Sequence, residues 1–181
     1  MKSVLVSLKP YYYYLVGEGI KEIEVRKNMP RASDWNKEVL VYMSKDVKSF
    51  AKIPKELRGK YRKHFGKVGM QIVCNEVYEW KYDYCDGVDI DDDLILDTCL
   101  DREDINIYAK GKTLYGWHIS DLKIYDKPKE LSEFRPICKF DGKDAICALF
   151  CPNWKYDGGL FFECTRKVTR PPQSYMYVEE L

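Results

Sequence analysis

The sequence predicts an α+β fold: a small mixed, partly closed β-barrel with short helices at its mouth and a cysteine-bearing loop insert. About five or six segments have strand patterns, some of them long and bent. Only two or three short helices are indicated, and the strands do not alternate regularly with long helices, which argues against a doubly wound parallel sheet. The chain has 181 residues, 45% of them hydrophobic. This is enough for one compact domain over residues 1–181.

The N-terminal part predicts two strands separated by a short aromatic helix. Residues 4–8 form an apolar run with β-branched residues, which is typical of a strand. Pro10 can occupy the first position of a helix, and Gly17 and Gly19 would end it. About two of its four tyrosines are expected to be buried. Residues 20–26 alternate as in a strand with one mainly charged face.

The middle of the chain predicts two more strands. Residues 38–43 are apolar and β-branched, and residues 67–80 read as a long strand in which Gly69 indicates a bend or bulge. Pro54 prevents a long helix between them. Residues 89–93 hold alternating carboxylates but lack the glycine of a calcium loop of the EF-hand type, so a solvated acidic loop is expected there.

The C-terminal half predicts one helix and two strands. Residues 101–109 suit a short helix with acidic residues in its first turn. Residues 114–125 suit a long strand, and residues 127–134 a turn or short helix. A last strand over residues 174–178 follows two consecutive prolines.

The formal net charge of +1 hides a strong asymmetry. Residues 1–67 contain sixteen Lys or Arg against seven Asp or Glu, whereas residues 76–104 contain two against twelve. One interpretation is a basic face that attracts phosphates. The other is that the two segments lie side by side and neutralise each other. No apolar run approaches the roughly 20 residues of a membrane span, and no signal peptide is recognisable. We therefore expect a cytoplasmic protein with reduced thiols and no membrane partner.

Four of the seven cysteines fall together in residues 135–169, a loop-rich stretch that we interpret as an insert. Their spacing is C-x8-C-x3-C-x12-C, and four thiolates can complete a tetrahedral zinc shell that staples such a segment. The predicted cofactor is thus a structural zinc ion. The alternative is that these side chains are paired or buried without metal. The predicted ligands are Cys138, Cys147, Cys151 and Cys164.

Residues 9–27 read KPYYYYLVGEGIKEIEVRK. With the preceding strand, this segment resembles the signature of the ASCH domain, a member of the PUA-like superfamily. The motifs LYGWHI at 114–119, YDKP at 125–128 and RPPQS at 170–174 are similar to those of phage and Gram-positive members. The cysteine segment resembles the variable insert of that subgroup, so the resemblance covers most of the chain.

The resemblance implies a PUA-like barrel with a cleft beside the first helix that receives RNA or a single nucleotide. Lys and Arg can bind phosphate there, a carboxylate can accept from an exocyclic base amine, and aromatic rings can stack on a base. From spacing alone, Glu24 and Arg26 could equally form an ordinary ion pair on a solvated strand face. The residues expected to contact nucleic acid are Lys9, Tyr11, Lys21, Glu24, Arg26, Lys27, Trp117, Gln173 and Ser174.

A hydrolase is the alternative function. Some ASCH-like bacterial proteins resemble amidohydrolases of N4-acetylcytidine, with a Lys at the position of Lys21 and a Thr three residues later. Here Glu24 occupies that later position, and a carboxylate is a less obvious nucleophile for an amide. If the chain is an enzyme acting on a modified nucleoside or on RNA, Lys21 and Glu24 are the catalytic pair, and in a nuclease either Glu24 or His118 could move the proton. A protein-interaction domain is a third alternative, for which the sequence offers no positive signal.

Overall fold

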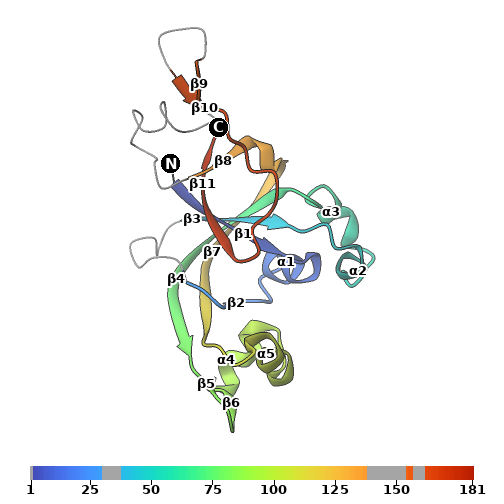
Figure 1. Cartoon of the computed structure of the whole chain (residues 1–181). Helices are drawn as coiled ribbons and strands as arrows, with labels where there is room; N and C mark the ends of the chain where they lie inside the picture. Colours follow the sequence, from blue (N-terminus) through green and yellow to red (C-terminus); the bar gives the residue numbers. More distant parts are fainter. Residues whose placement is uncertain (1, 30–37, 138–153, 157–161) are drawn as a thin grey trace.

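The computed structural model describes residues 2–29, 38–137, 154–156 and 162–181 (Figure 1). The elements in chain order are β1 (Lys2–Leu8), α1 (Pro10–Gly17), β2 (Ile23–Arg26), β3 (Glu38–Met43), α2 (Val47–Phe50), α3 (Arg58–Arg62), β4 (Val68–Trp80), β5 (Tyr82–Asp83), β6 (Gly87–Val88), α4 (Asp92–Thr98), α5 (Arg102–Ala109), β7 (Leu114–Lys129), η2 (Leu131–Glu133), β8 (Phe134–Pro136), β9 (Trp154–Tyr156), β10 (Phe162–Cys164) and β11 (Tyr175–Glu180).

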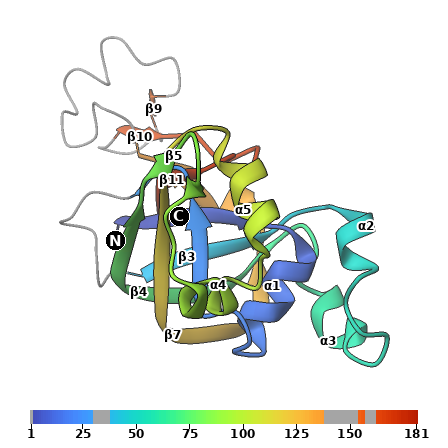
Figure 2. The same ribbon diagram turned by 90° about the horizontal axis from the view of Figure 1, so that it is seen from below.

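Seven strands form one large sheet in the order β2-β7-β4-β3-β1-β11-β8. Only β1 and β3 pair in parallel, and the other neighbours are antiparallel. The sheet curves so that α1 lies against its concave side (Figures 1 and 2). The predicted α+β class is therefore confirmed. Closure into a barrel is not, because no backbone ladder joins the end strands β2 and β8 in the described part of the chain.

The curvature comes from β4 and β7, which pair along most of their lengths with three register shifts. One shift lies between Val68 and Met70, at Gly69, where the sequence predicts a bend or bulge. Gly69 is required there because a Cβ would lie only 1.9 Å from His64 Nδ1. The sequence predicted a turn or short helix over residues 127–134. This is wrong for residues 127–129, which continue strand β7, and only η2 is helical in this range.

The main core lies between α1 and the sheet. Tyr13 and Tyr14 are buried and Tyr11 and Tyr12 are partly exposed, so two of the four tyrosines are buried, as predicted. Pro10 stands in the first turn of α1, as predicted. The two short helices α2 and α3 lie on either side of Pro54, which confirms that no long helix forms there.

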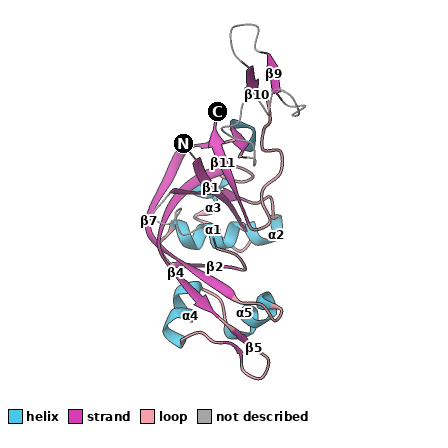
Figure 3. Cartoon of the chain, turned by 60° about the vertical axis from the view of Figure 1, so that its left-hand side comes forward, coloured by secondary structure: helices cyan, strands magenta, loops and turns pink. Residues whose placement is uncertain are grey.

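A second core cluster lies beyond β2, where α4, α5 and the β5–β6 hairpin gather at the far ends of β4 and β7 (Figure 3). The predicted helix at 101–109 is confirmed as α5. The expected acidic loop at 89–93 is wrong for its last two residues, because Asp92 and Asp93 form the first turn of α4, where carboxylates favour a helix N-terminus. None of the described helices is long and apolar enough to cross a membrane.

Candidate functional site

A cavity of about 570 Å³ opens between the start of α1, β2 and α5. It lies beside the first helix, where the resemblance placed a cleft. Six of the residues expected to contact nucleic acid line it, namely Lys9, Lys21, Glu24, Arg26, Lys27 and Gln173. The remaining lining residues are Ser7, Leu8, Tyr12, Val25, Leu100, Asp104, Ile107, Tyr108 and Lys110.

Three charged side chains lie buried at the base of this cavity. Lys21, Glu24 and Arg26 are 3%, 7% and 5% exposed. Glu24 Oε1 lies 2.9 Å from Arg26 Nε, and Glu24 Oε2 lies 3.6 Å from Lys21 Nζ. All four residues of β2 are buried, so the alternative of an ordinary ion pair between Glu24 and Arg26 on a solvated strand face is wrong. The physical reason is that Ile23 and Val25 pack into the second core cluster, whereas Glu24 and Arg26, at the alternate positions of the strand, contact Lys21 and the carbonyl oxygens of Ser7 and Ser174.

The guanidinium of Arg26 links strand β2 to the other side of the sheet. Its Nη1 donates to the carbonyl oxygen of Ser174 at 3.1 Å, just before β11, and its Nη2 donates to that of Ser7 at 2.8 Å, near the end of β1. Strand β2 pairs only with β7 in the sheet. Arg26 therefore bridges the opening that the backbone ladder leaves.

Lys21 is held from several sides. Its Nζ donates to the carbonyl oxygen of Thr98 at 2.5 Å and lies 5.6 Å from the centre of the Tyr12 ring. Burial lowers the pKa of Lys21, and the nearby charge of Glu24 opposes this shift. Because two cations share one carboxylate, the base of the cavity keeps a surplus of positive charge while Lys21 is protonated.

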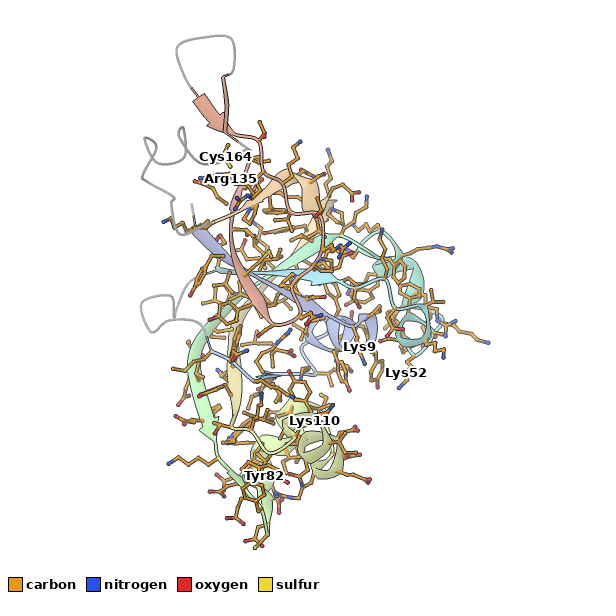
Figure 4. The ribbon with its side chains drawn as sticks, in the orientation of Figure 1. Lys9, Lys52, Tyr82, Lys110, Arg135 and Cys164 are labelled. Atoms are coloured by element: carbon orange, nitrogen blue, oxygen red, sulfur yellow. The ribbon has the colours of Figure 1, made fainter. Side chains whose placement is uncertain are left out.

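Aromatic and basic side chains form the walls and rim. Tyr12 on α1 and Tyr108 on α5 line the cavity, and burial raises the pKa of both hydroxyls. Lys27 Nζ lies 5.0 Å from the centre of the Tyr108 ring. Lys9, which precedes α1, and Lys110, which follows α5, are both exposed at the rim (Figure 4). Basic and aromatic side chains thus stand side by side at this cavity.

Three of the expected contact residues lie elsewhere. Trp117 is 1% exposed and packs in the main core against Tyr175, so it has no free face for stacking. Tyr11 packs against the rings of Tyr12 and Tyr14 and does not line the cavity. Ser174 lines a neighbouring cavity that shares only Lys27 with the first. Trp117 and Tyr11 therefore do not face the cavity, because tertiary packing decides which way an aromatic side chain is oriented.

Sequence reasoning offered residues 11–14 together for base stacking without selecting Tyr12, and it missed Asp104 and Tyr108. Tyr12 was obscured by three adjacent tyrosines, and only its place on α1 selects it. Asp104 and Tyr108 belong to the predicted helix at 101–109, but its approach to β2 is a long-range contact that no local pattern announces. His118 lies outside the cavity, where its Nδ1 is 2.7 Å from Asn75 Oδ1.

The predicted zinc ligands fall largely outside the described residues. This applies to Cys138, Cys147 and Cys151, whereas Cys164 ends β10 as a partly exposed free thiol. Within the described ranges, no group of three or more His, Cys, Asp or Glu side chains could hold a metal ion. The zinc site stays a prediction.

No protein-family model matches the sequence, and no curated protein matches it. Among solved structures, the chain is similar to the crystal structure of ASCH from Zymomonas mobilis, with 15% identity and a TM-score of 0.48 over 96% of this chain and 85% of that one. A mutant of that protein gives 14% identity and a TM-score of 0.50 over the same shares. At this level of identity the second likeness establishes the fold alone, and the chain thus has an ASCH-like fold.

Proposed function

We propose that the chain binds one nucleotide unit of RNA in the cavity between α1, β2 and α5. The observation that supports this most is the buried group of Lys21, Glu24 and Arg26, which leaves surplus positive charge beneath two aromatic walls. A volume of about 570 Å³ lies within the usual range of small-molecule sites. Phosphate is attracted by such a charge, and an unpaired base is accommodated by Tyr12 and Tyr108.

The parts of a nucleotide match different parts of the cavity. Lys9, Lys27 and Lys110 stand at or near the rim, where a phosphate stays partly hydrated. Glu24 has free acceptor capacity, because a carboxylate offers about four lone-pair sites and its two cationic neighbours occupy only part of them. It can therefore accept from an exocyclic amine, such as that of cytosine. Lys21 and Arg26 give the bottom of the cavity its positive charge.

Calorimetric titration with the four ribonucleoside monophosphates and their nucleosides tests the proposal. We expect monophosphates to bind more tightly than nucleosides, with a loss of roughly tenfold or more in Tyr108→Ala, because stacking contributes about 1–3 kcal/mol per base. Tyr84→Ala is the matched control, because Tyr84 is 89% exposed and does not line the cavity. Absence of binding, or equal binding by both variants, would refute the proposal.

A second candidate function is hydrolysis of a modified nucleoside or of RNA. It is favoured by one observation: burial lowers the pKa of Lys21, which lies 3.6 Å from Glu24. An amine with a lowered pKa is easier to deprotonate and can act as a general base. Turnover of N4-acetylcytidine or of an RNA oligomer, abolished in Lys21→Ala, would establish this activity. Binding without turnover would leave the chain a binding module.

We also propose that residues 1–181 form one ASCH-like domain of the phage and Gram-positive type that acts in the cytoplasm. It is supported by the motifs at 9–27, 114–119 and 170–174, which are spread over most of the chain.

A further inference from the structure

A strongly basic surface lies beside the candidate cavity. We call it the basic lobe and define it as residues 45–67, which contain α2 and α3. It holds nine Lys or Arg against two acidic residues, Asp46 and Glu56. The carboxylate of Asp46 is engaged as the N-cap of α2, where it accepts from the backbone N–H of Ser49.

More than half of these cations have no protein partner within the described part of the chain. Four have one, since Lys60 pairs with Glu18, Lys67 pairs with Glu130, and Arg58 and Lys63 donate to backbone carbonyls. The other five are exposed, and their side chains make no hydrogen bond or ion pair to a described residue: Lys45, Lys48, Lys52, Lys55 and Arg62. Such charges are available to an external anion.

The basic lobe adjoins the cavity through α1. The backbone N–H of Tyr11, in the first turn of α1, donates to Ser49 Oγ of α2 at 3.0 Å. Lys9 precedes that turn and lines the cavity, and Lys9 and Lys52 lie on the same side of the molecule (Figure 4). Basic side chains thus lead from the cavity over the start of α1 to α2.

The opposite side of the cavity repels a phosphate chain. Residues 76–104, which include α4 and the start of α5, hold twelve acidic residues against two basic ones, and Asp104 reaches the rim itself. The basic lobe and the α4–α5 region extend from different sides of the molecule (Figure 1). A strand that places one nucleotide in the cavity is therefore directed over α1 toward the basic lobe.

We propose that the basic lobe binds backbone phosphates of a polynucleotide, of which the cavity holds one nucleotide. This rests on the proposed function, and it specifies a strand of several nucleotides as the ligand. A membrane surface fits less well, because a helix that lies on lipid needs an apolar face. Among the described residues of the basic lobe, Val47, at 71% exposed, is the only exposed large apolar side chain.

A charge-neutralised variant of the full chain tests this. Lys48→Gln/Lys52→Gln/Lys55→Gln is compared with the matched control Lys81→Gln/Lys112→Gln/Lys123→Gln, whose lysines are exposed elsewhere. Binding of a short single-stranded RNA oligomer is measured at several salt concentrations, beside the tightest monophosphate. For the oligomer, we expect the slope of the logarithm of the binding constant against the logarithm of the salt concentration to become about 2 shallower in the basic-lobe variant. Each of the three lost phosphate contacts contributes about 0.7 to this slope on a single strand. Monophosphate affinity and the control should not change.

The outcomes separate this proposal from the function on which it rests. Equal losses of oligomer affinity in both triple variants, or an unchanged salt dependence of oligomer binding, would overturn the role of the basic lobe. Monophosphate binding in the same experiment would still support the cavity. Oligomer binding that depends on the basic lobe, with no monophosphate binding, would refute the cavity and support the basic lobe. Binding to phosphatidylserine vesicles that depends on the basic lobe, without oligomer binding, would assign this surface to lipid and overturn the proposal.

Discussion

Glu24 Oε1 lies 2.9 Å from Arg26 Nε, and both residues are buried at the base of the candidate cavity. Arg26 also donates to the carbonyl oxygens of Ser7, within β1, and Ser174, just before β11. The same pair therefore fixes the end strand β2 across the opening of the sheet and supplies charge to the cavity. Stability and binding are coupled at this point, and Lys21, the third member, allows them to be separated.

We expect Arg26→Met to lower the free energy of unfolding by about 3 kcal/mol, the usual effect of removing one partner from a buried ion pair. The variant loses two hydrogen bonds that link β2 to the ends of β1 and β11, and it leaves Glu24 with Lys21 alone. Urea denaturation measures the change. The matched control is Lys27→Met, since the neighbouring Lys27 is partly exposed. Similar small losses in both variants would contradict the bridging role.

Lys21→Met should weaken nucleotide binding while it leaves the stability of the fold nearly unchanged. Its stability at neutral pH should change by less than about 1 kcal/mol, because removing the charge also removes its desolvation penalty and Glu24 keeps Arg26. Nucleotide affinity should fall by about tenfold, or about 1.4 kcal/mol. A loss of stability as large as that of Arg26→Met would show that Lys21 is structural.

The pH dependence of Lys21→Met provides a second readout. The pKa of Lys21 is lower in the fold than its ordinary value of 10.5, so the unfolded chain binds more protons in the interval between them. The stability of the wild-type chain relative to the variant should therefore rise as pH increases through that interval toward 10.5. A difference that stays flat would contradict the lowered pKa.

The prediction of a structural zinc ion can be checked on protein purified without chelators. We expect about one zinc per chain, lost in Cys147→Ser, because four thiolates form a closed tetrahedral shell. Cys85→Ser is the matched control, since Cys85 is exposed and outside the predicted ligand set. A folded, metal-free chain would instead place these cysteines in the core or in redox chemistry.

Local sequence patterns predicted most of the strands, because alternation, β-branched residues and glycines determine strand and bulge positions without long-range information. They failed where tertiary packing decides. From spacing alone, Glu24 and Arg26 could form a solvated pair, yet in the fold both are buried, Glu24 beside Lys21 and Arg26 on the carbonyl oxygens of Ser7 and Ser174. Trp117 was expected to offer a stacking face, yet it is buried in the main core against Tyr175. Tyr108 was missed because α5 reaches β2 only in the fold.

His64 makes the stability of the fold depend on pH. It is 1% exposed, its Nδ1 lies 3.1 Å from the Tyr13 hydroxyl oxygen, and burial lowers its pKa from 6.5 to about 4. Between these values the unfolded chain binds a proton that the fold excludes, so stability rises with pH and is lost as pH falls from 6.5 toward 4. We expect a loss of about 2 kcal/mol between pH 6.5 and 4.5.

His64→Gln identifies the source of that loss, because the variant keeps a polar side chain but cannot titrate in this range. Its free energy of unfolding, measured by urea denaturation at each pH, should stay nearly constant between pH 6.5 and 4.5. Glu18, whose pKa is lowered by Lys60 and Tyr61, destabilises the chain in the same direction on acidification, but only below about its ordinary pKa of 4.5. The interval from about pH 6.5 to 4.5 therefore reports on His64 alone. If the free energy of unfolding falls equally with pH in the wild type and the variant, the acid sensitivity belongs to other groups.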